Sequence, residues 1–571
     1  MGDRACGLGT GAVATLGLAG ASHYFHLYST DVWSKSLGTT NVVKGQLMKL
    51  PVVVRRFLVW SPVLLLVWIG LLLLWPLSQP PLPTISNHPL LIHNVQLIDV
   101  LTGEVRTGQS VWIDNGRIQR ISPAAAETFT DHASGKWHRI DGNNRFLIPG
   151  LQDMHTHSMQ RSPQIHHPLW LAAGVTSLRD MSGCVAASDS FIACAADRKA
   201  WQQQMQHGLR SSPRYPIQSS FALDGGSEVP DGMPAYLKLQ SAADAKALVA
   251  NYQQLGVDQL KVYERMSLEQ FQWLSAAAKP ASMVLAGHKP WLVPLEDAID
   301  GGLRSLEHGR VFLFECATAI APYRAQPARQ GLITADVWQQ LLDSQDAGLC
   351  QQKMQILADS DSWWSPTLLT LQLGAKAMEP QFREDPRLDT VPWLLRKVWE
   401  GDADGSVENG RAADGRYPQK QAFALALTHL KQAHQLGVKI IAGTDAPDSF
   451  VFTGSGLHDE LALYVQAGLT PLQALQTATV NAARYSGTAG RSGQIAVGFD
   501  ADLVLLSTNP LVDIQALRQV QGLVIAGHWY DQPRLAKLQQ FALDQAGSLR
   551  INLHLVSGAL RSEMFRQQFA D

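Results

Sequence analysis

Two histidines separated by one residue end a short apolar run that extends from Phe146 to His157. In a strand, alternate side chains point to the same side, so His155 and His157 would project together while Thr156 points elsewhere. Two imidazoles in this arrangement can bind one metal ion. A His-x-His pair also arises by chance among 18 histidines, so the pair alone does not establish a metal site.

Further side chains of ligand type follow later strand-like runs. In chain order they are Lys261, His288, His308 and Asp445. Their surrounding signatures are Asp258–Tyr263, Ala286–Pro290, Ser305–Gly309 and Ala442–Pro447. Together with the first pair they supply histidines and a carboxylate, which are the ligands that zinc chemistry needs.

Lys261 is unusual in such a set. Its ammonium group would repel a cation, and its burial is unfavourable unless the charge is removed. If CO2 adds to the neutral amine, the resulting carbamate has two oxygens that can bridge two metal ions. The lysine therefore favours a binuclear site.

The elements that position these residues alternate between strand and helix. Strand-like runs occur at Gln259–Tyr263, Met283–Ala286, Arg304–Glu307 and Val438–Ala442, and helical stretches at Ala242–Leu255 and Leu268–Ala278. This alternation predicts a parallel sheet with helical crossovers, and the length of residues 149–487 favours a closed (β/α)8 TIM barrel. Catalytic residues in such a barrel lie at the C-terminal ends of strands, where the six residues fall.

Short strands separated by turns flank the barrel region. They are expected at Leu90–Asp99, Ser110–Asp114 and Arg117–Ile121, and again at Gly493–Asp500, Asp502–Leu506 and Leu523–Ala526. We expect residues 90–148 and 488–530 to form one small composite β-sandwich with the barrel inserted between them. Residues 531–571 should contain an amphipathic helix near Arg534–Leu549 and a tail.

Two stretches are interpreted as loops near the active site. Arg179–Pro234 is long and includes the turn-rich Leu223–Gly232. Glu400–Gly410 is acidic and rich in glycine, lacks the spacing of an EF-hand, and is interpreted as a solvated loop that could serve as a lid.

With these motifs the sequence resembles the metal-dependent amidohydrolase superfamily, in particular its imidazolonepropionase-like and prolidase-like branch. The resemblance covers about Leu90–Tyr530 and rests on the six ligand positions in order. Supporting matches are Ala173–Asp180, Trp364–Leu368, His458–Leu461, Ala467–Pro471 and Gly498–Leu503.

The resemblance implies a role for each ligand position. His155, His157 and Asp445 would hold a buried metal ion, His288 and His308 a more exposed one, and carboxylated Lys261 would bridge the two. Zinc is the expected metal. Two cations would lower the pKa of a water that bridges them, and Asp445, as general base, would pass its proton to the leaving amine.

Other polar residues near the motifs carry weaker expectations. Tyr263 alternates with Lys261 and could bind a substrate carbonyl or carboxylate, or could be a tyrosine of the core or rim. His458 suits a capping or supporting role better than ligation.

Three further pairs of residues carry expectations about their position. His166 and His167 are expected at the surface. Glu307 and Lys289 are adjacent to ligands on strands and are expected to point away from the site. Arg179 and Asp180 end a strand and could support the ligands.

Residues 57–75 contain no charge and have the length of a transmembrane helix. Basic residues precede this segment, and the next one after it is Arg106, so the positive-inside rule predicts cytoplasmic residues 1–56 and a membrane-anchored enzyme whose catalytic domain is periplasmic or extracellular. A cleaved signal peptide is the alternative. Residues 76–89 form a proline-rich linker, and Met48 is an alternative start.

Cysteine use is compatible with export. Beyond Cys6 the spacing suggests the pairs Cys184–Cys194 and Cys316–Cys350, while free buried thiols are the alternative. With 17% charged residues and a formal net charge of -2, the composition offers no bulk attraction for nucleic acid.

These observations predict a binuclear zinc hydrolase that cleaves an amide-type C–N bond of a small molecule or dipeptide. Lactone or phosphotriester hydrolysis on the same site and a mononuclear deaminase-like enzyme are alternatives. A membrane-tethered binding or scaffold protein with an inactive barrel is the alternative outside enzymes. The sequence leaves open the physiological substrate and the oligomeric state, a homo-oligomer included.

Overall fold

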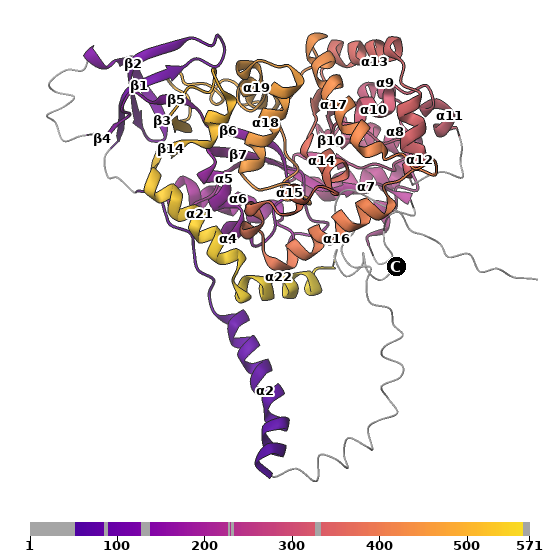
Figure 1. Cartoon of the computed structure of the whole chain (residues 1–571), viewed down its shortest axis with the longest axis horizontal. Helices are drawn as coiled ribbons and strands as arrows, with labels where there is room; N and C mark the ends of the chain where they lie inside the picture. The colour runs from indigo at the N-terminus through magenta and orange to yellow at the C-terminus, as the bar shows by residue number, and fades with distance from the viewer. Residues whose placement is uncertain are drawn as a thin grey trace, which may run out of the picture.

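The computed structural model describes residues 52–84, 89–126, 137–226, 229, 233–325 and 333–563. The expectations about Cys6, the alternative start at Met48 and the tail beyond residue 563 lie outside these residues. A barrel with surrounding helices makes up most of the body, and a β-sheet unit lies at one side of it (Figure 1). Helix α2 (Val52–Leu74) projects from this body.

Seven parallel strands form the barrel wall in the order β12-β11-β10-β9-β8-β7-β6. Their bounds are β6 (Leu151–Thr156), β7 (Val175–Asp180), β8 (Arg214–Leu223), β9 (Gln259–Val262), β10 (Val284–His288), β11 (Leu303–Glu307) and β12 (Trp363–Ser365). Spatial neighbours are also sequence neighbours, as expected for repeated strand-helix units.

Residues 438–446 occupy the eighth position and nearly close the barrel. Ile440 forms a parallel bridge to Trp364 on one side, and Ala446 forms one to Thr156 on the other. The predicted parallel α/β barrel is therefore present, with its last wall made by an extended segment that pairs through isolated bridges.

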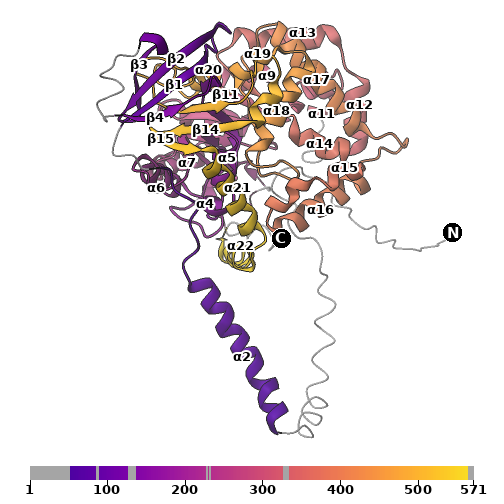
Figure 2. The same cartoon turned by 60° about the vertical axis from the view of Figure 1, so that its left-hand side comes forward.

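Helices connect successive strands on the outside of the barrel (Figure 2). In chain order they are α4 (Ser162–Ile165), α5 (His167–Ala172), α6 (Ala195–Gln206), α7 (Ala242–Gln254), α8 (Leu268–Ala278), α9 (Leu295–Asp300), α10 (Arg310–Glu315), α11 (Ile320–Arg324), α12 (Ala335–Asp343), α13 (Ala347–Asp359), α14 (Leu369–Lys376), α15 (Pro380–Arg383), α16 (Trp393–Asn409), α17 (Pro418–Gln435), α18 (Ser455–Ala467), α19 (Pro471–Thr477) and α20 (Val480–Tyr485). Short 3-10 turns lie at Ala124–Ala126, Ala235–Lys238, Pro386–Thr390 and Ile514–Arg518.

The β-unit combines strands from both sides of the barrel region. Its strands are β1 (Leu90–Ile98), β2 (Val105–Asp114), β3 (Arg117–Pro123), β4 (His138–Asp141), β5 (Phe146–Pro149), β13 (Leu503–Leu506), β14 (Val520–Ile525) and β15 (His528–Asp531). They form one sheet in the order β15-β14-β13-β5-β1-β2-β3, with β4 paired to β1. Strands from residues 90–148 and 488–530 are thus hydrogen-bonded into one composite sheet, and the sandwich arrangement stays a prediction. The strand expected at Gly493–Asp500 is absent, and Asp500 forms only an isolated bridge to Arg117.

The run from Phe146 to His157 joins the two units. Its first part is β5 of the β-unit and its second part is β6 of the barrel, with Gly150 between them. A Cβ atom on Gly150 would lie 2.2 Å from Thr176 Oγ1, so only glycine fits this close approach.

The two stretches expected to be loops contain regular structure. Helix α6 and strand β8 lie within Arg179–Pro234. Strand β8 buries Gln218, Ser219 and Ser220, so it lacks the apolar run by which a strand is predicted.

The prediction that the acidic stretch Glu400–Gly410 is a loop is wrong, because most of this stretch belongs to helix α16. Leu395, Trp399 and Ala403 recur every four residues and are buried. This spacing gives a helix its apolar face, and the acidic residues and glycines occupy the remaining positions.

The C-terminal region contains two helices, α21 (Gln532–Ala546) and α22 (Leu549–Arg561). Arg550 of α22 donates to the backbone carbonyls of Trp75 and Pro76, at the end of α2. Across the residues that the structure describes, no helix is both long enough and apolar enough to span a bilayer, and the anchor expected at residues 57–75 gains no support there.

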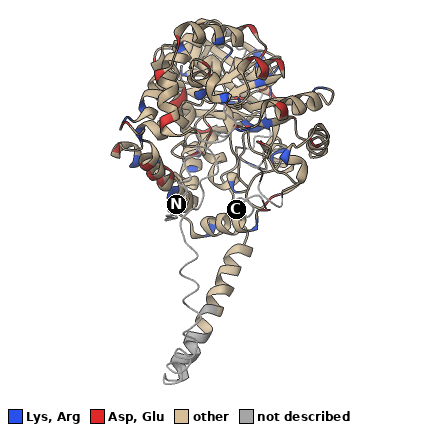
Figure 3. Ribbon diagram, turned by 90° about the vertical axis from the view of Figure 1, so that its right-hand side faces the viewer, with Lys and Arg blue, Asp and Glu red and all other residues tan. Residues whose placement is uncertain are grey.

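Charged residues of both signs are interspersed over the body, while α2 carries none from Phe57 to Leu74 (Figure 3). The cysteines form the two disulfides that their spacing suggested, Cys184–Cys194 and Cys316–Cys350. The alternative of free buried thiols is therefore wrong for these four residues.

Glu460 of α18 provides a stability prediction. Its buried carboxylate accepts hydrogen bonds from the N–H groups of Leu368 (2.7 Å) and Leu369 (3.0 Å), and burial raises its pKa to about 8. Between the ordinary pKa and about 8 the folded state holds a proton that the unfolded state releases, so stability should fall as pH rises. We expect Glu460→Gln to flatten this decline, measured by denaturant unfolding from pH 5 to 9.

The exposed Glu104 supplies the control, since Glu104→Gln should leave the pH slope unchanged. Parallel pH profiles for Glu460→Gln and the wild type would contradict the assignment.

Candidate metal centre

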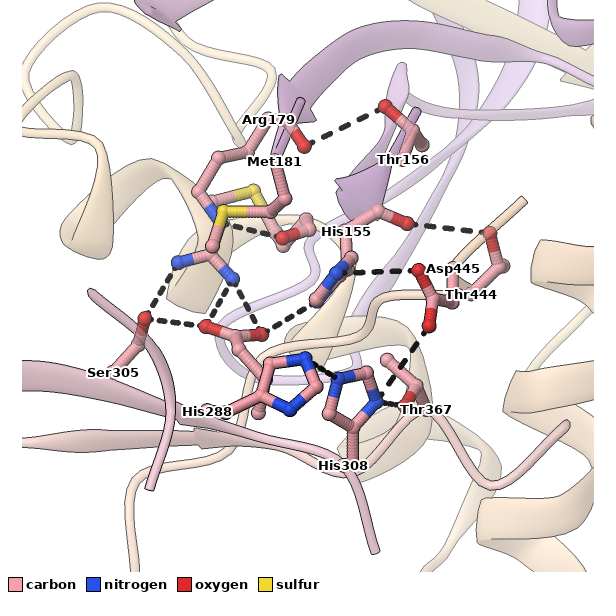
Figure 4. Close-up of polar contacts among 12 residues, drawn as sticks. His155, Thr156, Arg179, Met181, His288, Ser305, His308, Thr367, Thr444 and Asp445 are labelled. Atoms are coloured by element: carbon pink, nitrogen blue, oxygen red, sulfur yellow. Dashed lines mark hydrogen bonds and ion pairs between the residues drawn. The ribbon is translucent and has the colours of Figure 1, made fainter. Parts of the chain in front are cut away.

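The six predicted ligands gather at the C-terminal ends of the barrel strands. His155 and His157 lie at the end of β6, Lys261 on β9 and His288 at the end of β10. His308 follows β11, and Asp445 lies in the extended segment that closes the barrel. Figure 4 shows His155, His288, His308 and Asp445 directed toward one another.

Asp445 is the common neighbour of three histidines. Its Oδ1 atom lies 2.7 Å from His157 Nε2 and 3.3 Å from His155 Nε2, and its Oδ2 atom lies 3.7 Å from His308 Nδ1. Burial would raise the pKa of Asp445, but the adjacent histidines outweigh it and hold the pKa well below the usual value. The carboxylate is therefore ionised and central.

Backbone pairing places Asp445 at this position. Its N–H donates to the carbonyl oxygen of His155 at 2.8 Å. The preceding Thr444 donates from both its N–H (3.0 Å) and its hydroxyl (2.7 Å) to Asp153 of β6. The two strand ends that carry ligands are thus joined directly.

His288 and His308 present their Nε2 atoms to each other at 2.9 Å. Burial lowers the pKa of His288 to about 4, and it lowers that of His308 well below the usual value. Both rings are neutral at pH 7, which leaves nitrogen lone pairs for metal binding.

Lys261 lies in the same buried group, with 4% of its surface exposed. Burial lowers the pKa of its amine, although Asp445, Glu307 and Asp180 oppose the shift. A lowered pKa increases the fraction of neutral amine, which is the form that reacts with CO2.

In three of the histidines, the Nδ1 atom lies within hydrogen-bond distance of a side-chain oxygen. His155 Nδ1 lies 2.9 Å from Glu307 Oε2, and His288 Nδ1 lies 3.0 Å from Glu264 Oε1. His308 Nδ1 lies 2.7 Å from Thr367 Oγ1. Metal-binding histidines commonly have such partners, which fix the tautomer and direct the other nitrogen at the metal.

The donor set fits metal ions. In addition to this arrangement, His155 Nε2 is buried without a hydrogen-bond partner in the described part of the chain, although it lies near Asp445. A buried unpaired nitrogen is unfavourable unless something else binds it. His155, His308 and Asp445 also place ligand atoms within 4.8 Å of one another.

Glu307 corrects the sequence expectation, because it faces the site. Fully buried Arg179 contacts both of its oxygens, at 2.7 and 2.8 Å, and Ser305 Oγ at 2.7 Å. Burial would raise the pKa of Glu307, but Arg179 and His155 outweigh it and lower the pKa to about 2. Arg179 therefore supports the ligands through Glu307.

The loop after His157 is fixed by Asp180. This carboxylate accepts hydrogen bonds from the N–H groups of Ser158 (2.8 Å) and Ser182 (2.9 Å). The supporting role expected for Asp180 is thus played through backbone contacts.

Glu264 and Thr367 are supporting residues that the sequence interpretation missed. Glu264 also pairs with Arg310, whose Nη1 atom lies 2.8 Å away. Each residue had a signal in the sequence: Glu264 follows Tyr263 directly, and Thr367 lies within the motif Trp364–Leu368.

Three residues of this centre have a strained backbone. Positive φ values occur at His308 (75°), Asp445 (73°) and Thr367 (39°). Residues other than glycine adopt such values rarely, and the cost is tolerated where surrounding structure fixes the residue for function.

The remaining predicted residues lie at different distances from the centre. Tyr263 is partly buried, with its ring centroid 4.3 Å from that of His288, so it borders the site. Lys289 points away, as expected, and pairs with buried Glu315 at 2.8 Å. His458 is buried with Nε2 2.8 Å from the carbonyl of Ala173, outside the ligand group.

The surface positions expected for His166 and His167 are wrong, because both residues are buried. His167 Nε2 lies 2.8 Å from the Tyr215 hydroxyl, and His166 Nδ1 lies 2.9 Å from Ser162 Oγ. His166 lies between α4 and α5, and His167 is the first residue of α5. Both helices pack against α21, which covers a face that the local sequence suggests is exposed.

Glu307→Gln should weaken metal binding at His155. The amide cannot balance the charge of Arg179 and holds His155 Nδ1 less firmly, so we expect roughly a 10- to 100-fold loss of metal affinity. Metal content after dialysis against graded chelator measures this loss. Glu296→Gln, at a pair with Lys353 away from the site, is the control and should retain its metal.

A model of the Amidohydrolase family matches residues 423–530. The ochratoxinase of Aspergillus niger is 39% identical over 150 residues, which cover 23% of this chain and 30% of that protein. The matched region therefore spans less than a third of this curated relative.

Solved structures resemble most of the chain. The alignment with a structure named bottromycin amidohydrolase covers 81% of this chain and 91% of the chain in that structure. The TM-score is 0.61 and the sequence identity is 21%. The alignment with a Xaa-Pro dipeptidase that has methionine bound in its active site covers 78% of this chain and 100% of the chain in that structure. The TM-score is 0.53 and the sequence identity is 19%. At these identities the likeness establishes a shared fold.

Proposed function

We propose that this chain is a member of the metal-dependent amidohydrolase superfamily, a hydrolase that cleaves an amide-type C–N bond of a small molecule or dipeptide. The match of residues 423–530 to the Amidohydrolase family model and the fold shared with solved amidohydrolase structures support this proposal. The observation that carries the proposal is the convergence of His155, His157, His288 and His308 on Asp445 and Lys261 at the strand ends. An inactive scaffold would have no reason to keep this complete set and its supporting carboxylates.

Two divalent metal ions, with zinc expected, would be held by these residues. His155, His157 and Asp445 would bind one and His288 and His308 the other, with carboxylated Lys261 between them. When bound, the metal ions would lower the pKa of a water molecule and polarise the carbonyl group of the substrate.

Asp445 would act as the general base. It is ionised and buried, and it lies at the meeting point of the ligand groups, so it can accept a proton from water and deliver it to the leaving nitrogen. Tyr263, on the border of the site, would bind a carbonyl or carboxylate oxygen of the substrate.

The substrate class follows from the relatives in part. The names of the bottromycin amidohydrolase and the Xaa-Pro dipeptidase denote hydrolysis of amide or peptide bonds. Lactone or phosphotriester hydrolysis remains the second candidate, because the same ligands activate water for either reaction.

Metal analysis combined with a substrate panel tests the proposal. We expect about two zinc equivalents per chain and hydrolysis of at least one dipeptide or N-acyl amino acid in the panel. One equivalent would indicate a mononuclear deaminase-like enzyme, and turnover only of lactones or phosphotriesters would replace the C–N assignment. A chain that binds no metal and hydrolyses nothing would be a scaffold.

A membrane-anchored location with a periplasmic or extracellular catalytic domain is a further proposal. The charge asymmetry around residues 57–75 supports it, as do two disulfides, since disulfides persist in oxidising compartments. Reporter fusions after residue 84 should be active outside the cytoplasm, and activity only inside would contradict the location.

A further inference from the structure

A second group of metal-ligand atoms lies between helices, outside the centre described above. Cys316 follows α10, Cys350 lies on α13 and His429 on α17, and these three helices pack against one another. One ligand atom from each residue lies within 4.8 Å of the other two. All three residues are buried, with 0%, 5% and 3% of their surfaces exposed.

His429 has an unused nitrogen in this group. Its Nδ1 atom is buried and has no hydrogen-bond partner among the described residues. Burial lowers the pKa of the ring to about 4, so the imidazole is neutral at pH 7. Its other contact is apolar: the Phe312 ring meets it edge-on at a centroid distance of 6.3 Å. A buried nitrogen without a hydrogen-bond partner is unfavourable, and here it belongs to an imidazole that places a ligand atom near two sulfurs.

The sulfurs are joined as a disulfide and become ligands only on reduction. A dithiol reductant transfers two electrons and two protons to the disulfide, breaks the S–S bond, forms two Cys thiols and becomes a disulfide itself. Binding of a metal ion then releases the two thiol protons. Cys350 lies in the first turn of α13, where the helix dipole favours the thiolate.

We propose that reduced Cys316 and Cys350, together with His429, form a second metal site that takes a divalent d10 cation of the zinc type. Two thiolates neutralise the charge of a dication, and the neutral imidazole adds none, so the complex suits its buried surroundings. A monovalent cation would leave a net negative charge there. In the oxidised chain the disulfide occupies the sulfurs, and the site binds no metal.

The experiment uses Cd2+ as the probe on the full chain with Cys6→Ser, Cys184→Ser and Cys194→Ser, which leaves only the two relevant cysteines. Thiolate-to-cadmium charge transfer absorbs in the ultraviolet, and the histidine and carboxylate ligands of the catalytic centre do not contribute to it. We expect no such band in the oxidised chain and a band that saturates at about one equivalent after dithiol reduction.

His429→Gln should reduce the affinity for Cd2+ by at least about tenfold. The matched control is His458→Gln, which alters another buried histidine outside both ligand groups and should leave the titration unchanged. Circular dichroism and thermal unfolding of each oxidised variant show whether it folds. If His429→Gln does not fold, His429→Asn serves in its place.

Two results would overturn the site. One is a reduced, folded chain that gives no thiolate band with Cd2+. The other is equal affinity in the parent chain and the folded His429 variant, which would mean that two thiolates bind the ion without the imidazole. Neither result bears on catalytic activity, so the proposed hydrolase can stand or fail separately.

Discussion

Asp445→Asn should reduce kcat by roughly 10²- to 10⁴-fold, the range that general acid-base catalysis contributes. Asparagine has nearly the same shape as aspartate but cannot accept a proton at neutral pH. Asp445 is also the shared neighbour of His155 and His157, so the loss of its charge should weaken the metal ion held by these histidines. Initial rates on the best substrate of the panel, with saturating zinc, measure the effect.

Saturating zinc separates the two roles of Asp445. If metal content returns to the wild-type value while kcat remains low, the missing function is proton transfer. Asp448→Asn is not a suitable control, because burial and Asp445 raise the pKa of Asp448 to about 7. The half-buried Asp114 ends β2 in the β-unit and is not one of the residues of the candidate centre, so Asp114→Asn should retain full activity. Near wild-type turnover in zinc-loaded Asp445→Asn would falsify the general-base assignment.

Lys261→Met should remove one of the two metal equivalents and reduce activity by about 100-fold or more. This loss should exceed the one expected when a residue that only hydrogen-bonds to a metal ligand is changed. Methionine preserves the apolar stem and the volume, so packing in the barrel should persist. What it lacks is the amine that would form the proposed carbamate. Metal analysis and kcat/KM measure the two effects.

Two variants make the bridging role specific. Lys261→Glu restores a carboxylate near the position of the carbamate, and it should retain more metal than Lys261→Met. Lys353→Met, at a partly buried pair with Glu296 outside the candidate centre, should behave as the wild type. Two metal equivalents in folded Lys261→Met would contradict a bridging lysine.

Local sequence determined several elements with accuracy. Helix α8 was expected at Leu268–Ala278 and has those bounds, because Ser267 and Gln270 form a capping box before an amphipathic stretch. Strand β8 and helix α16 were missed. The first is a barrel strand with buried polar residues, and the apolar face of the second lies among acidic residues and glycines.

The sequence by itself predicted that the six candidate ligands gather, because each lies at or near the end of a strand-like run and the ends of parallel strands meet at one face of a barrel. It could not determine what holds them. Glu307 was expected to point away from His308, but β11 ends at Glu307, and the positive φ of His308 turns the chain there. Both side chains therefore face the centre, although they are adjacent in sequence.

Contacts between distant strands decided the rest. Glu307 meets Arg179 and His155, Glu264 meets His288, and Thr367 meets His308. Partners of this kind are separated by 24 to 152 residues in the chain. The spacing of residues within a strand shows which side chains can share a face. The closed barrel determines which side chains of other strands hydrogen-bond to them.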